Sequence, residues 1–339
     1  MAVTNYEKPK RVTRNDVAKL AGVSPAVVSY VINSSKFVSE EKTAAVKKAI
    51  EELQYRPNLQ ARGLKTNRSM QIAFVCDNLR NDWLEEAEKL LFEKGYYVSH
   101  CYSRDGEEFI QMLIARQFDG VFMMSNRFST AQLNEIAAAG IPVVLYKTRK
   151  YGELNPNIVS LVPDLVDGVI KSVNYLAMRG HEKIALIPPI RYRTQGLSDD
   201  GFRVRAYMDA MTQNGLELRE ELVCTETESM ETILSSVFNM LINSNKDVRP
   251  TAFICGNDYI AVQVIQFIKK LGINVPEDVA VIGTDNIYLA TVVTPTLTTV
   301  DFSKEEFAQK LAEKLLKLMN GEIPEDESLK VSIVIRESA

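Results

Sequence analysis

Residues 13–68 read TRNDVAKLAGVSPAVVSYVINSSKFVSEEKTAAVKKAIEELQYRPNLQARGLKTNR, and their pattern determines how the first part of the chain folds. Thr13 precedes Asp16 by three residues, which is the spacing of a capping box and predicts the start of a helix. A glycine ends this helix, and Ser24 with Pro25 supplies the N-cap and first turn of the next one. The sequence therefore predicts two short helices joined by a glycine turn.

A third helix is expected to follow, because Ser39 is succeeded by two glutamates whose charges suit the positive end of a helix. Its apolar positions Val46, Ile50 and Leu53 lie on one helical face and can pack against the first two helices. Three short helices in this order form a helix-turn-helix domain, whose second helix enters the major groove of DNA. We therefore expect a DNA-binding domain over residues 1–56.

The charge is distributed unevenly along the chain. Residues 1–68 hold 13 Lys and Arg against 6 Asp and Glu, a net charge of +7, whereas residues 69–339 carry a net charge of −11. Clustered positive charge displaces counterions from phosphates, so a basic domain on an acidic protein suggests nucleic-acid binding. Charge alone fits a solvated basic helix face equally well, and the helical pattern decides in favour of DNA.

The same stretch resembles the DNA-binding domain and hinge of the LacI/GalR family of bacterial transcription regulators. The resemblance rests on DVAKLAGVS, VVSYVIN, VSEEKTAAV, YRPN and ARGLKT. It implies DNA contacts by Thr13, Ser24, Pro25, Ala26, Val27, Ser29, Tyr30 and Asn33. Ser29 and Tyr30 can hydrogen-bond to bases, while Ala26 and Val27 can meet thymine methyl groups. Many relatives carry arginine where Tyr30 stands, so the base that is read there stays open.

Residues 57–68 are the second expected unit, a hinge helix with a linker. By resemblance, the hinge orders on the operator and contacts DNA through Asn58, Arg62 and Leu64, with Leu64 as a wedge in the minor groove. A leucine wedge needs a second copy beside it, which implies a homodimer on a pseudopalindromic operator. As bare sequence the segment also fits a flexible tether, and Gly63 lowers its helix propensity by up to about 1 kcal/mol.

From residue 69 onward, apolar runs alternate with amphipathic stretches of helical length. Fully apolar runs of this kind are typical of parallel strands that are covered by helices on both faces. The expected strands are 71–77, 96–102, 119–124, 142–148, 157–163, 183–190, 222–226, 251–256, 279–285 and 331–336. The fold class is therefore α/β, with enough chain for two such sheets.

The resemblance to the family extends over this part of the chain through RGHEKIALI, TAFICGNDYIAVQVI and VPEDVAVIGTDN. It implies two subdomains of the type I periplasmic-binding-protein-like fold, built as parallel α/β sandwiches that close on a small effector. The expected N-terminal effector subdomain comprises residues 69–162 with 301–327. The expected C-terminal one comprises residues 163–300 with 328–339.

Open parallel sheets bind ligands beyond the carboxyl ends of their strands, and the resemblance places Arg203, Asn257 and Asp285 there. An arginine, an amide and a carboxylate can read a polyol through paired donors and acceptors. Structural roles compete with this interpretation. Arg203 can instead join an interdomain ion pair, and Asp258 is expected to be a helix cap.

Two further residues bear on the chemistry of the effector. Lys147 stands where relatives commonly carry an aspartate, so it predicts either an acidic group on the effector or an internal pair with Asp164. Trp83 lies in a region, 78–91, that looks shortened, and it can stack on a sugar ring or pack in the core. We expect a sugar-type effector, with an acidic or phosphorylated sugar as the narrow hypothesis and a neutral sugar as the broader one.

The remaining composition excludes several classes of protein. No stretch approaches the roughly 20 apolar residues of a membrane helix, and the start of the chain has no signal-peptide core, so we expect a cytoplasmic protein. Four separate cysteines and two histidines cannot assemble a zinc site, and we expect neither metal nor cofactor. No nucleophile or phosphate-loop motif occurs, which argues against an enzyme.

The expected function is a sequence-specific DNA-binding regulator, most simply a repressor of carbohydrate-utilisation genes that responds to a small effector. One alternative is a global catabolite regulator whose corepressor is a phosphorylated carrier protein. A solute-binding protein for transport is the alternative from another class, but it would need a signal peptide and no helix-turn-helix domain.

Overall fold

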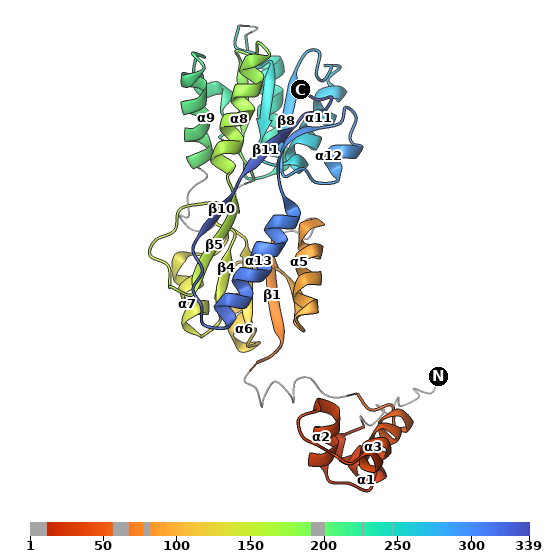
Figure 1. The fold of residues 1–339 in the computed structure, drawn as a ribbon. Coiled ribbons are helices and arrows are strands. Elements are labelled where there is room, and N and C mark those ends of the chain that lie inside the picture. Colours follow the sequence, from red (N-terminus) through yellow and green to blue (C-terminus); the bar gives the residue numbers. More distant parts are fainter. Residues whose placement is uncertain (1–11, 57–67, 78–81, 191–200, 226, 246) are drawn as a thin grey trace, which may run out of the picture. The chain divides into compact units, whose positions relative to one another are not determined.

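The computed structural model describes residues 12–56, 68–77, 82–190, 201–225, 227–245 and 247–339. The chain divides into two compact units, Met1–Ser69 and Met70–Ala339, here called the head and the body. Figure 1 shows the helices of the head and the two layered halves of the body.

The head folds as the three helices that the sequence predicts. They are α1 (Arg14–Leu20), α2 (Pro25–Asn33) and α3 (Glu40–Glu52). A capping box begins α1, since the Thr13 N–H donates to Asp16 Oδ2 at 2.8 Å and Thr13 Oγ1 accepts from the Asp16 N–H at 3.4 Å. The three helices enclose one small core of Val17, Ala18, Val28, Val46 and Ala49.

The first sheet of the body has the strand order β10-β5-β4-β3-β1-β2, and all its neighbouring strands are parallel. Its strands are β1 (Gln71–Cys76), β2 (Tyr97–Tyr102), β3 (Gly120–Met124), β4 (Val143–Leu145), β5 (Ile158–Pro163) and β10 (Glu327–Leu329). Helices α5 (Asp82–Glu93) and α13 (Lys304–Met319) cover one face, and α6 (Glu107–Ala115) and α7 (Thr130–Ala138) cover the other.

The second sheet has the order β11-β9-β8-β7-β6 and is parallel except for the β9–β11 pair. Its strands are β6 (Ile184–Ile187), β7 (Ala252–Cys255), β8 (Ala280–Thr284), β9 (Thr298–Phe302) and β11 (Val331–Val334). Helices α8 (Leu165–Met178) and α9 (Gly201–Gln213) cover one face, and α10 (Met230–Phe238) and α11 (Asp258–Lys270) cover the other. The short helix α12 (Leu289–Val292) follows β8.

The chain crosses between the two sheets three times. It leaves the first sheet after β5, returns from β9 into α13, and leaves again from β10 into β11. The first and third crossings touch, because the Asp164 N–H donates to the Leu329 carbonyl at 2.8 Å. Any movement of one sheet relative to the other must therefore bend these three segments.

Parts of the expected strand pattern are wrong. Of the expected strand 222–226, the described residues 222–225 form no strand, since a short 3-10 helix ends at Leu222 and Val223 makes an isolated bridge to Leu186. The expected strand 142–148 ends at Leu145, because the following loop turns to hydrogen-bond with the loop after β3. Strands β9 and β10 lie where no strand was expected. Within the described residues, no helix is long and apolar enough to cross a membrane.

Candidate functional site

Of the DNA-contacting residues expected in the head, Thr13 is the N-cap of α1, and the others lie at the N-cap of α2 and within that helix. Pro25, Ala26 and Asn33 are exposed, whereas Ser29 and Tyr30 are half-buried. Positions 26, 29, 30 and 33 share one helical face, which suits a helix that enters the major groove. Asn58, Arg62 and Leu64 lie outside the described residues.

Two cations beside this face, Arg14 and Lys36, were not predicted from the sequence. Arg14 donates to Ser29 Oγ at 3.4 Å, and the Asn33 amide donates to the Ser29 carbonyl at 2.9 Å and approaches its hydroxyl at 3.4 Å. The ammonium group of Lys36 lies 5.0 Å from the centre of the Tyr30 ring, within the range of a cation–π contact. The expected base-reading residues are thus held by neighbours that can also reach DNA.

In the body, Arg203 lies at the carboxyl ends of the second sheet's strands. It projects from α9, is 7% exposed, and lines a cavity of about 10 Å³ with Pro188, Gly256 and Thr284, which follow or end β6, β7 and β8. Such a cavity holds no more than one water molecule. Asp285 comes directly after β8 with a φ of 105°, a left-handed backbone conformation that few non-glycine residues adopt.

Electrostatic effects show that three polar groups gather around Asp285. Burial raises the pKa of the Asp285 carboxyl to about 7, while the charges of Arg203 and Lys304 lower it. Burial also raises the pKa of Tyr146, with Asp285 adding to the shift and Arg203 opposing it. Tyr146 follows β4 in the first sheet, and Lys304 begins α13 on that sheet's side. The cluster of Arg203, Asp285, Lys304 and Tyr146, here called the cleft cluster, therefore includes residues from both halves of the body.

The expected roles of Asn257 and Asp258 are partly exchanged. Asn257 is the N-cap of α11, and its Oδ1 accepts from the Ile260 N–H at 2.8 Å. Asp258 was expected to be the cap, but it is fully buried and accepts from Thr299 Oγ1 at 2.5 Å and from the Ile287 N–H at 2.8 Å. The physical reason is that the residue before the first helical turn has the extended backbone that a cap requires. An effector contact by Asn257 stays a prediction.

Lys147 has a different partner from the one expected. Its ammonium lies 3.9 Å from Asp326, while Asp164 accepts from the Asp167 N–H at 3.0 Å and caps α8. The alternative of an internal pair with Asp164 is therefore wrong, because among the described residues the carboxylate within 4.0 Å of the Lys147 ammonium is that of Asp326. Trp83 belongs to α5, and its side chain lies outside the described part of the structure.

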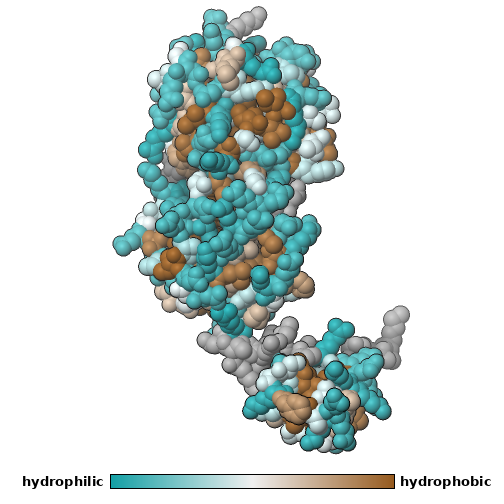
Figure 2. Space-filling model, viewed as in Figure 1, coloured by the Kyte–Doolittle hydropathy of each residue, from teal (hydrophilic) through white to brown (hydrophobic). Residues whose placement is uncertain are grey.

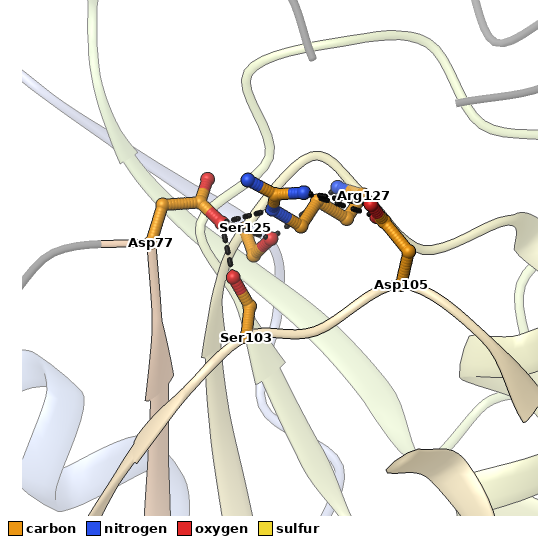
Figure 3. A network of polar contacts seen from close by, with 5 residues as sticks. All are labelled: Asp77, Ser103, Asp105, Ser125 and Arg127. Carbon is orange, nitrogen blue, oxygen red and sulfur yellow. Dashed lines mark hydrogen bonds and ion pairs between the residues drawn. The ribbon is translucent and has the colours of Figure 1, made fainter. Parts of the chain in front are cut away.

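A second polar network, missed from the sequence, follows the strands of the first sheet (Figure 3). Asp77 Oδ1 accepts from the Ser103 hydroxyl, from the Ser125 hydroxyl at 2.8 Å and from Arg127 Nε at 3.1 Å. Arg127 also binds both carboxylate oxygens of Asp105, at 3.0 and 3.1 Å. Asp77, Ser103 and Ser125 each come one residue after a strand. The expectation that functional side chains follow the carboxyl ends of strands, which selects Asp285, would therefore also have selected them. The network connects the ends of three strands, and the charge of Arg127 is paired within it by Asp77 and Asp105.

Comparison with known proteins defines the class of the chain. The family described as "Bacterial regulatory proteins, lacI family" matches residues 13–58, and the "Periplasmic binding protein-like domain" matches residues 173–339. The transcriptional repressor PurR of Glaesserella parasuis is 33% identical over 313 residues, which cover 90% of this chain and 89% of that protein. PurR of Erwinia tasmaniensis is 31% identical and covers 94% of each chain.

Solved structures agree with this fold. The lac repressor dimer bound to operator and the anti-inducer ONPF superposes with a TM-score of 0.80 at 24% identity, covering 97% of this chain and 99% of that one. The regulator CelR in complex with cellobiose has a TM-score of 0.69 at 25% identity and covers 97% of this chain and 100% of that one. The chain belongs to the lacI family of bacterial regulatory proteins. It is a DNA-binding transcriptional repressor with a periplasmic-binding-protein-like effector domain.

Proposed function

We propose that this repressor binds a pseudopalindromic operator as a homodimer, and that a small effector between the two sheets of the body controls its operator affinity. It acts by binding alone, without catalysis, and it works in the cytoplasm. The observation that carries the proposal is the cleft cluster. Its residues come from both halves of the body and affect one another's charge, so a ligand that contacts them bears on how the halves are arranged.

The effector that we propose is a sugar or a sugar derivative, and an acidic or phosphorylated one is the narrower proposal. Cellobiose bound to CelR and D-xylulofuranose bound to another relative support a sugar-type ligand. Arg203 and Asp285 supply the donors and the acceptor that hydroxyl groups need. Lys147 and Arg203 supply the positive charge that a carboxylate or phosphate needs.

The proposal is tested by selecting the operator from random duplexes with the full-length chain and then measuring its affinity in the presence of candidate effectors. We expect a two-fold symmetric sequence with half-sites about one helical turn apart. Neutral sugars, sugar acids and sugar phosphates are first screened by thermal unfolding. A ligand at a hundred times its dissociation constant adds about 2.7 kcal/mol of stability. Leu64→Ala is the hinge variant, and it should weaken binding to the selected operator far more than to random DNA.

Each part of the proposal has its own contradicting result. Selection of no common sequence would reject the operator-binding function, and equal losses on both DNAs would reject the wedge role of Leu64. The acidic effector is rejected if neutral sugars stabilise the chain, acidic ones do not, and Lys147→Ala leaves that binding intact.

A further inference from the structure

The DNA-facing surface of α2 carries no charge of its own. Its side chains at positions 26, 29, 30 and 33 are those of alanine, serine, tyrosine and asparagine, which are all neutral. In the major groove, the commonest specific contact is made by an arginine or a lysine on guanine. Any cation that reads bases beside this face therefore comes from another element of the head.

Arg14 on α1 is a cation in direct contact with this face. It is the first residue of α1, and its Nη1 donates to the hydroxyl oxygen of Ser29 at 3.4 Å. The two helices are fixed against each other, because Val17 of α1 and Val28 of α2 are fully buried in one core. No ion pair of the described residues includes Arg14. Its guanidinium is thus held at the DNA-facing surface with its charge available to a ligand.

The place of Arg14 on its own helix is unfavourable for stability. The first turn of a helix is positively polarised, so it repels a cation and favours a carboxylate. Asp16 meets this preference, since its Oδ2 accepts from the Thr13 N–H at 2.8 Å and from the Thr13 hydroxyl at 2.6 Å. Helix stability therefore explains Asp16 but not Arg14, which fits a binding role better than a structural one.

Arg14 and Ser29 together present hydrogen-bond donors to the groove. The Ser29 hydroxyl oxygen also accepts from the Asn33 amide at 3.4 Å, so both of its acceptor positions are used and its O–H is left to donate. A guanidinium has donors alone. In the major groove, guanine shows the two acceptors O6 and N7, whereas adenine and cytosine each show a donor. The donors at this point of the head therefore match guanine.

We propose that Arg14 is a base-reading residue of this repressor, which recognises a guanine in each half-site next to the bases that α2 contacts. The inference rests on the operator binding proposed above and adds a specificity contact from outside the recognition helix. One guanidinium can bind O6 and N7 of a guanine at the same time. The bond to Ser29, at 3.4 Å, is long for a hydrogen bond, so little is lost when the guanidinium turns to a base.

Operator selection from random duplexes tests this contact with the full-length wild type and with Arg14→Met. We expect the wild type to select a G·C pair at one position of each half-site. Arg14→Met should accept any pair there and keep the rest of the sequence. Changing this pair to A·T in one half-site should weaken wild-type binding about tenfold or more, and that of Arg14→Met about twofold or less.

Lys19→Met is the matched control for the loss of a cation. Lys19 is an exposed residue in the last turn of the same helix, and positions 14 and 19 do not share a helical face. This variant should select the same sequence as the wild type, with the G·C pair retained.

Two further measurements test the contact independently of Arg14→Met. 7-Deazaguanine lacks the N7 acceptor, so its use at the selected position should weaken binding of the wild type and leave that of Arg14→Met unchanged. Glutamine pairs with adenine in the major groove, so Arg14→Gln should move the preference at this position from guanine towards adenine.

Three results would reject the role of Arg14 and leave operator binding intact. They are a guanine preference that both Arg14 variants retain, an equal effect of 7-deazaguanine on wild type and Arg14→Met, and a loss of affinity in Arg14→Met that is the same for all duplexes. The last result, with a weaker salt dependence, is that of a phosphate contact. A wild-type chain that selects no common sequence would instead reject the proposed operator binding together with this inference.

Discussion

At the scale of single residues, the side chain of Asp258 on α11 holds a neighbouring loop in place. Its carboxylate accepts from Thr299 on β9 and from the Ile287 N–H, so it ties the loop that carries Asp285 to the next strand. A Cβ on Gly283 would lie 2.2 Å from Asp258 Oδ1, which shows how closely the carboxylate packs against β8. The position of the candidate effector contact Asp285 therefore depends on a buried acid.

This burial predicts a pH dependence of stability. The pKa of Asp258 rises from 3.8 to about 8, mainly through burial and then through Asp285. Between these pH values the folded state keeps a proton that the unfolded state loses, so the contribution is complete below pH 3.8 and disappears as the pH rises through about 8. We expect the free energy of unfolding to fall from pH 5 to pH 8, by at most about 1.4 kcal/mol per pH unit for one proton.

Asp258→Asn should flatten this slope, whereas Asp209→Asn, at an exposed position on α9, should leave it unchanged. The measurement is urea unfolding across the pH series. A slope that is the same in wild type and Asp258→Asn contradicts the assignment, and part of the slope should remain in that variant because Asp285 titrates in the same direction.

At the scale of helices and strands, the sequence was most informative where local chemistry decides the structure. The capping box at Thr13 forms between residues three apart, and the strands β1, β3, β7 and β8 each contain an apolar run that is visible in the local sequence. Strand β10 has only three residues, and it forms by pairing with β5, which is far away in the chain. No local sequence pattern could therefore predict it. The apolar run that starts at Leu222 shows the converse, since its described residues, 222–225, make one isolated bridge and no strand.

The residues of the candidate site also differ in whether the local sequence could predict them. Arg203 and Asp285 could be predicted because they match a family pattern and a strand end. Lys304 and Tyr146 could not, because one begins a helix and the other follows a three-residue strand, and only the tertiary arrangement brings them to Asp285.

The packing of β8 against α11 gives a prediction at this scale. In Gly283→Ala the new methyl group would meet Asp258 Oδ1 at 2.2 Å and Leu297 Cδ2 at 2.8 Å, so a carboxylate and a core side chain must both shift. Overpacking of this kind costs about 1–3 kcal/mol, and we expect the upper part of that range because the displaced carboxylate is hydrogen-bonded. Calorimetry should show a lower unfolding temperature.

Gly152→Ala is the control, since its methyl group would meet Thr130 at 3.6 Å, an ordinary contact. Equal unfolding temperatures for the two variants would mean that β8 and its neighbours shift to accept the methyl group more easily than these distances indicate.

At the scale of the whole molecule, the head and the body have separate cores, so each needs the other for function rather than for folding. Figure 2 shows an apolar area on the face of the body that carries β11, α11 and α12. Tyr288 precedes α12, Val292 is its last residue and Ile335 follows β11, and these side chains are 67%, 51% and 58% exposed. Large apolar side chains gathered on one surface are typical of an interface between proteins. The homodimer that we propose supplies a second copy to cover them.

Val292→Glu tests this interface, because a charge that becomes buried on association loses solvation without gaining a partner. We expect light scattering to show a shift from dimer to monomer at micromolar concentration. Operator affinity should fall with it, since two linked heads bind their half-sites at a high effective concentration and a single head does not. Met178→Glu places the same charge on another exposed apolar position, the last residue of α8, and should remain dimeric. A wild-type monomer or tetramer would contradict the dimer itself. A dimeric Val292→Glu chain with unchanged operator binding would instead place the interface on another face.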